Sequence, residues 1–116
     1  VDRSALEAIA GAVVAGSGDT IVEIGPGRGA LTDILAARGN PLIAIEIDRA
    51  LSEKLRERYG SNPRVTIVER DVLETDVAAL AAGPFVVVGN VPYYITTPIL
   101  FHVLRPPFPR SAVFLV

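Results

Sequence analysis

The sequence contains no cysteine, no methionine and no tryptophan among its 116 residues. Without cysteine there can be no disulfide and no thiolate zinc site, and a single histidine, His102, cannot form a metal cluster, so we predict no metal. No apolar run approaches the roughly 18 residues of a membrane-spanning helix, and the first residues do not resemble a signal peptide. These absences favour a cytoplasmic protein that has no membrane partner.

The sequence also has little excess charge of either sign, because 13 acidic and 11 basic side chains leave a formal net charge of −2. Proteins built around a nucleic-acid clamp are usually strongly basic, so a polyanionic partner would have to be held locally or by another domain. Hydrophobic residues make up 50% of the chain, which is too apolar for disorder and enough for one compact domain. The chain starts at Val1 and stops inside an apolar run, so we interpret it as part of a longer protein.

Apolar stretches and helical patterns alternate along the chain. Strands are predicted at 20–24, 41–47, 65–68 and 85–88, with a fifth from Ala112. Helices are predicted from a capping box at Ser4 and Glu7 to Val14, from the glycine turn to Gly39, around Leu51 and Leu55 to Gly60, over 77–82, and from a Thr97–Pro98 cap to Leu104. This alternation predicts an α/β fold of Rossmann-like, doubly wound type with a mostly parallel sheet. Ligands of such sheets bind beyond the carboxyl ends of the strands.

The first predicted strand leads into a turn, 25–29, with the sequence Gly-Pro-Gly-Arg-Gly. Glycines here allow a sharp turn and let the backbone come close to a ligand. A dinucleotide site requires G-x-G-x-x-G, whose last glycine is replaced by Ala30, and a pyrophosphate would fit poorly beside Glu23. S-adenosyl-L-methionine has no phosphate and fits this turn better, although a turn that binds nothing would show the same pattern.

Acidic residues follow the next two predicted strands. Glu46 ends the second strand about 20 residues after Gly25, where a carboxylate can accept both hydrogen bonds of a ribose diol. Asp48 is better placed to cap the following helix than to contact a ligand. Asp71, after the third strand, could accept from an adenine amino group, although a solvated acid in a charged loop explains it equally well. Together these strand ends favour an adenosyl cofactor.

After the fourth predicted strand comes a polar and aromatic segment, which we predict to be a loop containing Asn90, Val91, Pro92 and Tyr93. The exocyclic amine of adenine is a poor nucleophile because its lone pair is delocalised into the ring. Acceptors such as Asn90 favour a more tetrahedral nitrogen, and an aromatic face such as Tyr93 holds the base and tolerates positive charge. No general base is needed, since the amine becomes acidic only after methylation. A proline-fixed turn with a core tyrosine is the alternative.

Four segments resemble the ribosomal RNA adenine dimethyltransferases of the KsgA type: VEIGPGRGALT, IEIDR, ERDVLE and NVPYYITTP. The resemblance implies a monomeric cytoplasmic enzyme that transfers methyl groups from S-adenosyl-L-methionine to adenosine N6 in small-subunit ribosomal RNA. It implies that residues 1–116 form a methyltransferase domain truncated before its later strands and a helical C-terminal domain. It also implies catalytic roles for Asn90, Val91, Pro92 and Tyr93, and cofactor contacts from Glu23, Gly25, Gly27, Glu46, Ile47, Asp71, Val72 and Asn90.

Several alternatives stay open on the sequence. The related Erm enzymes, which methylate an adenosine of large-subunit RNA, share the Asn-x-Pro-Tyr segment. A DNA adenine or a protein amide as substrate is disfavoured by Val91, because the related segments there are Asn-Pro-Pro-Tyr. A non-catalytic ribosome-assembly module could keep the same scaffold, and a nicotinamide oxidoreductase is disfavoured by the glycine spacing.

Overall fold

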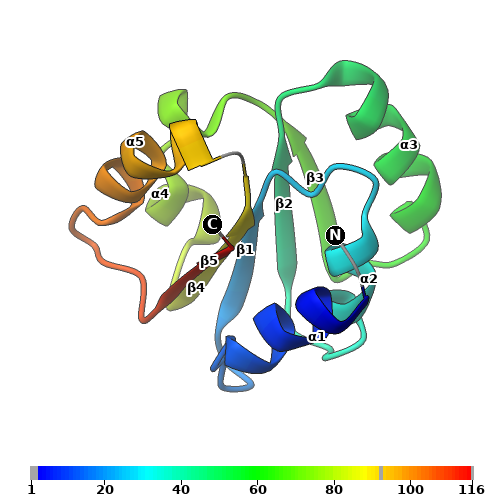
Figure 1. Ribbon diagram of the computed structural model, residues 1–116. Coiled ribbons are helices and arrows are strands. Elements are labelled where there is room, and N and C mark those ends of the chain that lie inside the picture. The colour runs from blue at the N-terminus through cyan, green and yellow to red at the C-terminus, as the bar shows by residue number, and fades with distance from the viewer. Residues whose placement is uncertain (1–2, 92, 116) are drawn as a thin grey trace.

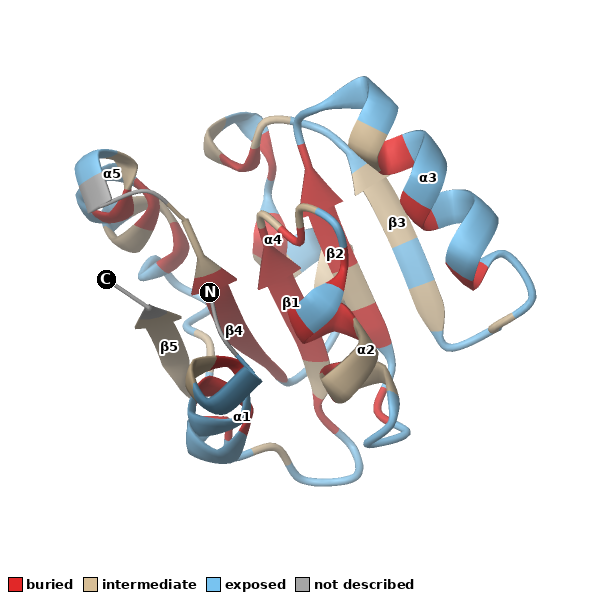
Figure 2. Cartoon of the chain, turned by 45° about the vertical axis from the view of Figure 1, so that its right-hand side comes forward, coloured by how far each residue is buried: buried red, intermediate tan, exposed pale blue. Residues whose placement is uncertain are grey.

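The computed structural model describes residues 3–91 and 93–115, the side chains of 93 and 115 excepted. Five parallel strands form one sheet in the order β3-β2-β1-β4-β5. The strands are β1 (Thr20–Ile24), β2 (Leu42–Glu46), β3 (Val65–Glu69), β4 (Phe85–Asn90) and β5 (Ala112–Leu115). Their arrows all point to one edge of the sheet in Figure 2. The Rossmann-like fold is therefore confirmed, and the strand order switches direction between β1 and β4, where such sheets bind ligands.

Helices cover both faces of this sheet, with α1, α2 and α3 on one face and α4 and α5 on the other (Figure 1). The helices are α1 (Arg3–Ala12), α2 (Ala30–Ala36), α3 (Arg49–Tyr59), α4 (Val77–Ala81) and α5 (Tyr93–Val103), with a short 3₁₀ helix η1 (Val72–Glu74). Alternate strand residues supply two separate cores: Ile21 and Val86 pack with α1 and α2, whereas Val22 and Val87 pack with α4 and α5. No helix within the described ranges has both the length and the apolar character needed to cross a membrane.

The segment after β4 differs from the prediction. The structure extends β4 through Asn90 and begins α5 at Tyr93, so the predicted loop and the Thr97–Pro98 cap are wrong and Pro98 lies inside the helix. The reason is tertiary packing: Ile99 and Val103 are buried in the core on the α4 side, and Ile95 packs against the same core. Burial of these three apolar side chains stabilises the helix by more than the loss of the one backbone hydrogen bond that Pro98 cannot make.

Helix ends show how far local signals hold. Asp48 caps α3 as predicted, because its Oδ1 accepts a hydrogen bond of 2.9 Å from the Leu51 N–H. The predicted capping box at Ser4 is wrong, since α1 already includes Arg3 and Ser4 lies within its first turn. Glu7 instead accepts a 2.8 Å hydrogen bond from the Arg3 side chain one helical turn away.

Candidate active site

A cavity of about 340 Å³ opens at the carboxyl ends of β1, β2 and β4. Most of the residues singled out from the sequence line it: Gly25, Glu46, Ile47, Asp71, Val72, Asn90 and Val91. They come from strand ends far apart in sequence, and the parallel pairing of β1 with both β2 and β4 brings them to one edge. The structure thus assembles the predicted residues, while their roles toward a ligand stay predictions.

Gly25 brings the glycine turn close to the end of β4. Its φ angle is +70°, in the left-handed region that disfavours other residues. A Cβ at this position would lie 2.9 Å from Val91 Cγ1 and 3.7 Å from the Asn90 carbonyl oxygen. The Gly25 N–H also donates a 3.0 Å hydrogen bond to the Ile45 carbonyl of β2. The turn is therefore fitted between the ends of β2 and β4, with no room for a side chain.

The Glu46 carboxylate is fixed by the backbone on two sides. Its Oε1 accepts a 3.0 Å hydrogen bond from the Gly27 N–H, and its Oε2 accepts one of 2.9 Å from the Asp48 N–H. The residue is only 6% exposed, although it lines the cavity. Carboxylate oxygens can accept a second bond each, so the predicted ribose contacts would add to these two. The sequence did not reveal that this carboxylate ties the glycine turn to the start of α3.

Glu23 precedes Ile24 in β1 but is not among the residues that line the cavity. It is 1% exposed, and Oε1 accepts a 2.5 Å hydrogen bond from the Thr32 hydroxyl of α2. Burial raises the pKa of Glu23 to about 7; the Thr32 hydrogen bond lowers this pKa, and the charges of Asp33 and Glu46 raise it further. A direct cofactor contact from Glu23 is not part of the observed lining and remains a prediction.

The remaining predicted residues lie on β4, α5 and η1. Asp71 is half-buried at the cavity, and its Oδ1 caps η1 by accepting a 2.9 Å hydrogen bond from the Leu73 N–H. Asn90 is the half-buried last residue of β4. Tyr93 is the first residue of α5, and its side chain, like the whole of Pro92, lies outside the described residues.

Charge in the cavity favours a cationic ligand. The lining carries the carboxylates of Glu46 and Asp71 against one guanidinium, that of Arg70. The Gly27 N–H already bonds Glu46, so this part of the turn presents a negative charge where a dinucleotide site would hold pyrophosphate. Within the described ranges no group of three or more His, Asp or Glu residues is placed to hold a metal ion.

The family model for ribosomal RNA adenine dimethylase matches residues 1–116. The chain belongs to this family. A ribosomal RNA small subunit methyltransferase A from Acidobacterium capsulatum is 53% identical over 88 residues, which are 74% of this chain and 31% of that protein. The crystal structure of the 23S rRNA methyltransferase ErmE superimposes with a TM-score of 0.87 at 32% identity, covering 98% of this chain and 46% of ErmE.

A more distant structure shares the fold alone. The glycopeptide N-methyltransferase MtfA, solved in complex with S-adenosyl-L-methionine, has a TM-score of 0.66 at 20% identity over 86% of this chain and 47% of that one. The chain thus spans about a third of its Acidobacterium relative (31%) and about half of ErmE (46%).

Other cavity residues of this dimethylase family member were not predicted. Ile24 is the last residue of β1, Ile45 is the last but one of β2, and Ile95 and Ile99 come from α5. A rule that strand ends meet at the site would have found the first pair. Tyr94, 75% exposed at the cavity, was assigned to the predicted loop but not to the site, because the helical start at Tyr93 was missed.

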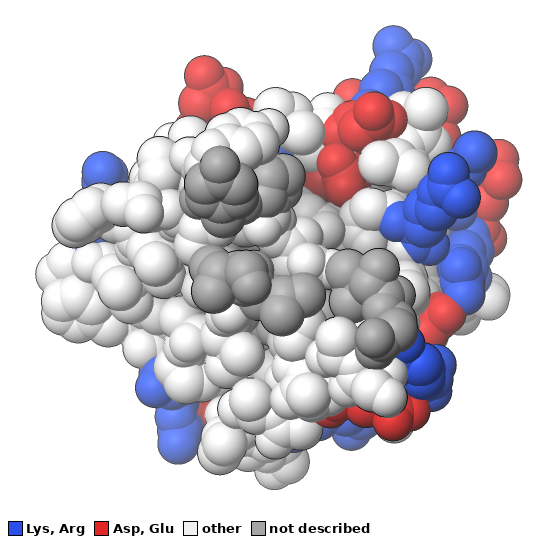
Figure 3. All heavy atoms as spheres, viewed as in Figure 1, with Lys and Arg blue, Asp and Glu red and all other residues white. Residues whose placement is uncertain are grey.

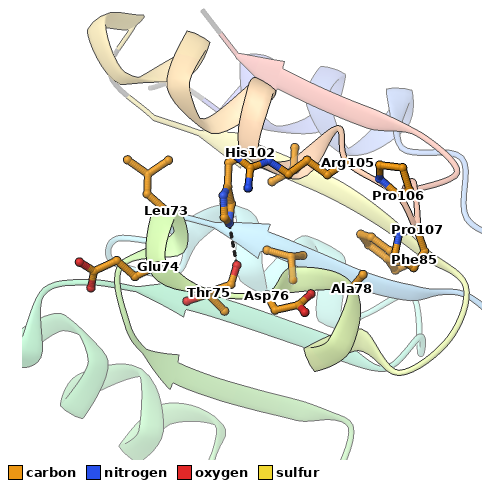
Figure 4. Close-up of a pocket in the computed structure, with 12 residues that line it drawn as sticks. Leu73, Glu74, Thr75, Asp76, Ala78, Phe85, His102, Arg105, Pro106 and Pro107 are labelled. Carbon is orange, nitrogen blue, oxygen red and sulfur yellow. Dashed lines mark hydrogen bonds between the residues drawn. The ribbon is translucent and has the colours of Figure 1, made fainter.

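A second cavity of about 380 Å³ lies between α4 and α5, and none of the predicted site residues lines it (Figure 4). There the His102 ring points toward the segment before α4, with Nε2 at 2.6 Å from the Thr75 carbonyl oxygen. Thr75 is itself held by its hydroxyl, which donates a 2.8 Å hydrogen bond to the Asp71 carbonyl. The His102 contact therefore links α5, through Thr75, to Asp71 at the start of η1.

Proposed function

We propose that this chain is the cofactor-binding part of an S-adenosyl-L-methionine-dependent enzyme that dimethylates N6 of adenosines in small-subunit ribosomal RNA. The hydrogen bond from the Gly27 N–H to Glu46 carries the proposal. A dinucleotide would need that N–H for its phosphates and would meet a carboxylate there, whereas a sulfonium compound brings a cation and no phosphate. Family membership and the name of the Acidobacterium relative, a ribosomal RNA small subunit methyltransferase, support the RNA substrate.

The cavity fits the size and the groups of an adenosyl compound. Its volume of about 340 Å³ is at the lower end of typical ligand pockets. The remaining lone pairs of Glu46 would accept from the ribose hydroxyls, and Asp71 from the adenine amine. Ile47, 67% exposed despite being apolar, and Val72 would contact the faces of the adenine ring. When bound, S-adenosyl-L-methionine supplies an electrophilic methyl group.

The target amine would enter beside the Gly25 turn. Asn90 ends β4 there, and its side-chain oxygen and the Val91 carbonyl would accept the two amine hydrogens, which localises the nitrogen lone pair. Tyr93 would stack on the base and tolerate its developing positive charge. The proton leaves after methylation, when the nitrogen has become acidic, so these residues act by orientation rather than as a base. Pro92 would fix the segment between Val91 and Tyr93.

The similarity to ErmE favours a second candidate, methylation of large-subunit ribosomal RNA. Transfer of a labelled methyl group by the full-length protein, offered each ribosomal RNA separately, distinguishes the two. We expect label on the small-subunit RNA. Label confined to large-subunit RNA would establish the second candidate instead.

Cofactor choice is tested by calorimetric titration of the full-length protein. We expect S-adenosyl-L-methionine to bind and NAD to give no saturable heat. Binding of NAD without binding of the sulfonium compound would overturn the proposal. We also propose that the enzyme works in the cytoplasm and is a monomer. Sedimentation of the full-length protein measures the oligomeric state and checks the second point.

A further inference from the structure

A third hollow adjoins the glycine turn on the side of α3. Its volume is about 340 Å³, and its lining consists of Gly27, Arg28, Leu51, Lys54, Leu55 and Arg58. The four α3 members, Leu51, Lys54, Leu55 and Arg58, stand at positions i, i+3, i+4 and i+7, so they share one face of the helix. We call this group of six residues the basic hollow.

The wall of the basic hollow is held in place by contacts between α3 and the glycine turn. Gly29, at φ +91°, packs so closely that a Cβ would lie 3.0 Å from Leu55 Cδ2. Arg58 forms an ion pair with Asp33 of α2, and its Nη1 donates a 3.4 Å hydrogen bond to the Arg28 carbonyl. Tyr59 donates its hydroxyl proton to the same Asp33. Burial and this contact raise the pKa of Tyr59 above its usual range, so the hydroxyl remains a donor.

The lining carries three cations and no carboxylate, in a chain whose formal net charge is −2. Arg58 is paired with Asp33, but within the described ranges no carboxylate lies within 4.0 Å of the Arg28 or Lys54 cationic groups. Other α3 cations differ, because Arg49 is paired with an acid on its own helix. Figure 3 shows Lys and Arg side chains over α3, at the right of the view, with Asp and Glu side chains between them.

We propose that the basic hollow binds a phosphodiester group of the RNA substrate. Lys54 and Arg28 would contact the phosphate oxygens, and the half-buried Leu51 would lie against the ribose. The site would hold the RNA backbone beside the glycine turn. The inference rests on the proposed function, because it takes the substrate to be RNA. A chain with a small negative net charge would hold a polyanion locally or through another domain, and the basic hollow offers such a local site.

The test measures the salt dependence of RNA binding by the full-length protein and its Lys54→Gln and Arg28→Gln variants. The probe is a small-subunit ribosomal RNA transcript. Each lost phosphate contact should reduce the slope of log K against log salt by about 0.7, which corresponds to about fivefold weaker binding near 0.1 M salt. Arg49→Gln is the matched control on the same helix and should keep the wild-type slope. Calorimetric titration with S-adenosyl-L-methionine should show the same affinity for Lys54→Gln as for the wild type.

The outcomes separate this inference from the proposed function. If the wild type binds and methylates RNA while Lys54→Gln and Arg28→Gln keep the slope of Arg49→Gln, the inference alone is overturned. If the wild type neither binds nor methylates RNA, both are overturned. Free phosphate shares the chemistry of a phosphodiester, so the wild type is also titrated with inorganic phosphate at fixed ionic strength. We expect no saturable heat; saturable binding that Lys54→Gln abolishes would assign the hollow to the free ion and overturn the RNA proposal.

Discussion

Replacing Glu46 by glutamine tests the residue on which the candidate site depends most. The change keeps the shape of the side chain but turns one accepting oxygen into an NH₂ group. That group must face either the Gly27 or the Asp48 N–H, each of which now bonds the carboxylate at 3.0 and 2.9 Å. One charge-assisted hydrogen bond is lost, and we expect the free energy of unfolding to fall by about 1.5–3 kcal/mol.

The same substitution should weaken cofactor binding. A ribose diol that donates to both carboxylate oxygens, as we propose, would lose one charged acceptor in the variant, which is worth about 1.5–3 kcal/mol, or about a 10- to 150-fold higher Kd. Denaturant unfolding measures the first effect, and calorimetric titration with S-adenosyl-L-methionine measures the second. Glu69→Gln is the matched control, because Glu69 is the β3 residue paired with Glu46 and makes only a surface ion pair with Arg56 at 3.4 Å.

The two measurements refute different parts of the reasoning. If stability falls but the Kd stays at the wild-type value, the carboxylate holds the glycine turn and does not contact the ribose. If neither quantity changes relative to Glu69→Gln, the two backbone hydrogen bonds do not contribute as the geometry indicates. Both effects together are the expected result.

The other predictions concern the residues around Glu46. Because the pKa of Glu23 is raised to about 7 in the folded protein, above the ordinary 4.5, its ionisation costs stability as the pH rises from about 4.5 to 7. Glu23→Gln should flatten that decline, on the order of 3 kcal/mol, in denaturant unfolding at pH 5 and 8; an unchanged pH profile would contradict the burial argument. Gly25→Ala should cost about 1–2 kcal/mol of unfolding free energy, because it strains a φ of +70° and its Cβ meets Val91 at 2.9 Å; wild-type stability would show that the turn can shift. Asn90→Ala should remove most methyl transfer and change the Kd for S-adenosyl-L-methionine much less, because Asn90 would act mainly on the target amine; unaltered turnover would refute its role.

Local sequence signals predicted most of the fold. The apolar strands and the glycine turn needed no long-range information, and Asp48 caps α3 because capping depends on a residue three positions away. The start of α5 could not be predicted in this way. Either Pro92 or Pro98 could mark the first turn of a helix. Which one does depends on how Ile95 and Ile99 pack against strands that are remote in sequence.

In the candidate site, too, the sequence predicted which residues come together but not the contacts that they make. The strand-end rule brought Gly25, Glu46 and Asp71 together, because parallel strands align their carboxyl ends. The sequence did not show which groups each side chain already bonds, such as Glu46 with the glycine turn. Nor could it show the Arg58–Asp33 pair, whose members are 25 residues apart. Such contacts are set by the packing of α3 against α2.

The glycine turn separates two surroundings of opposite charge. Toward the cavity it meets Glu46, which is 6% exposed, and toward α3 it carries Arg28 beside Lys54. Salt screens exposed charges strongly and buried ones weakly, so the two surroundings respond differently to ionic strength. If the two proposals hold, a cofactor whose ribose bonds the buried Glu46 carboxylate would keep its affinity at salt concentrations that release RNA from the exposed cations. The two sides of the turn could therefore bind a cationic and an anionic ligand at the same time. On the cavity side the Gly27 N–H is bonded to the Glu46 carboxylate, and on the α3 side the positive charge comes from Arg28 and Lys54.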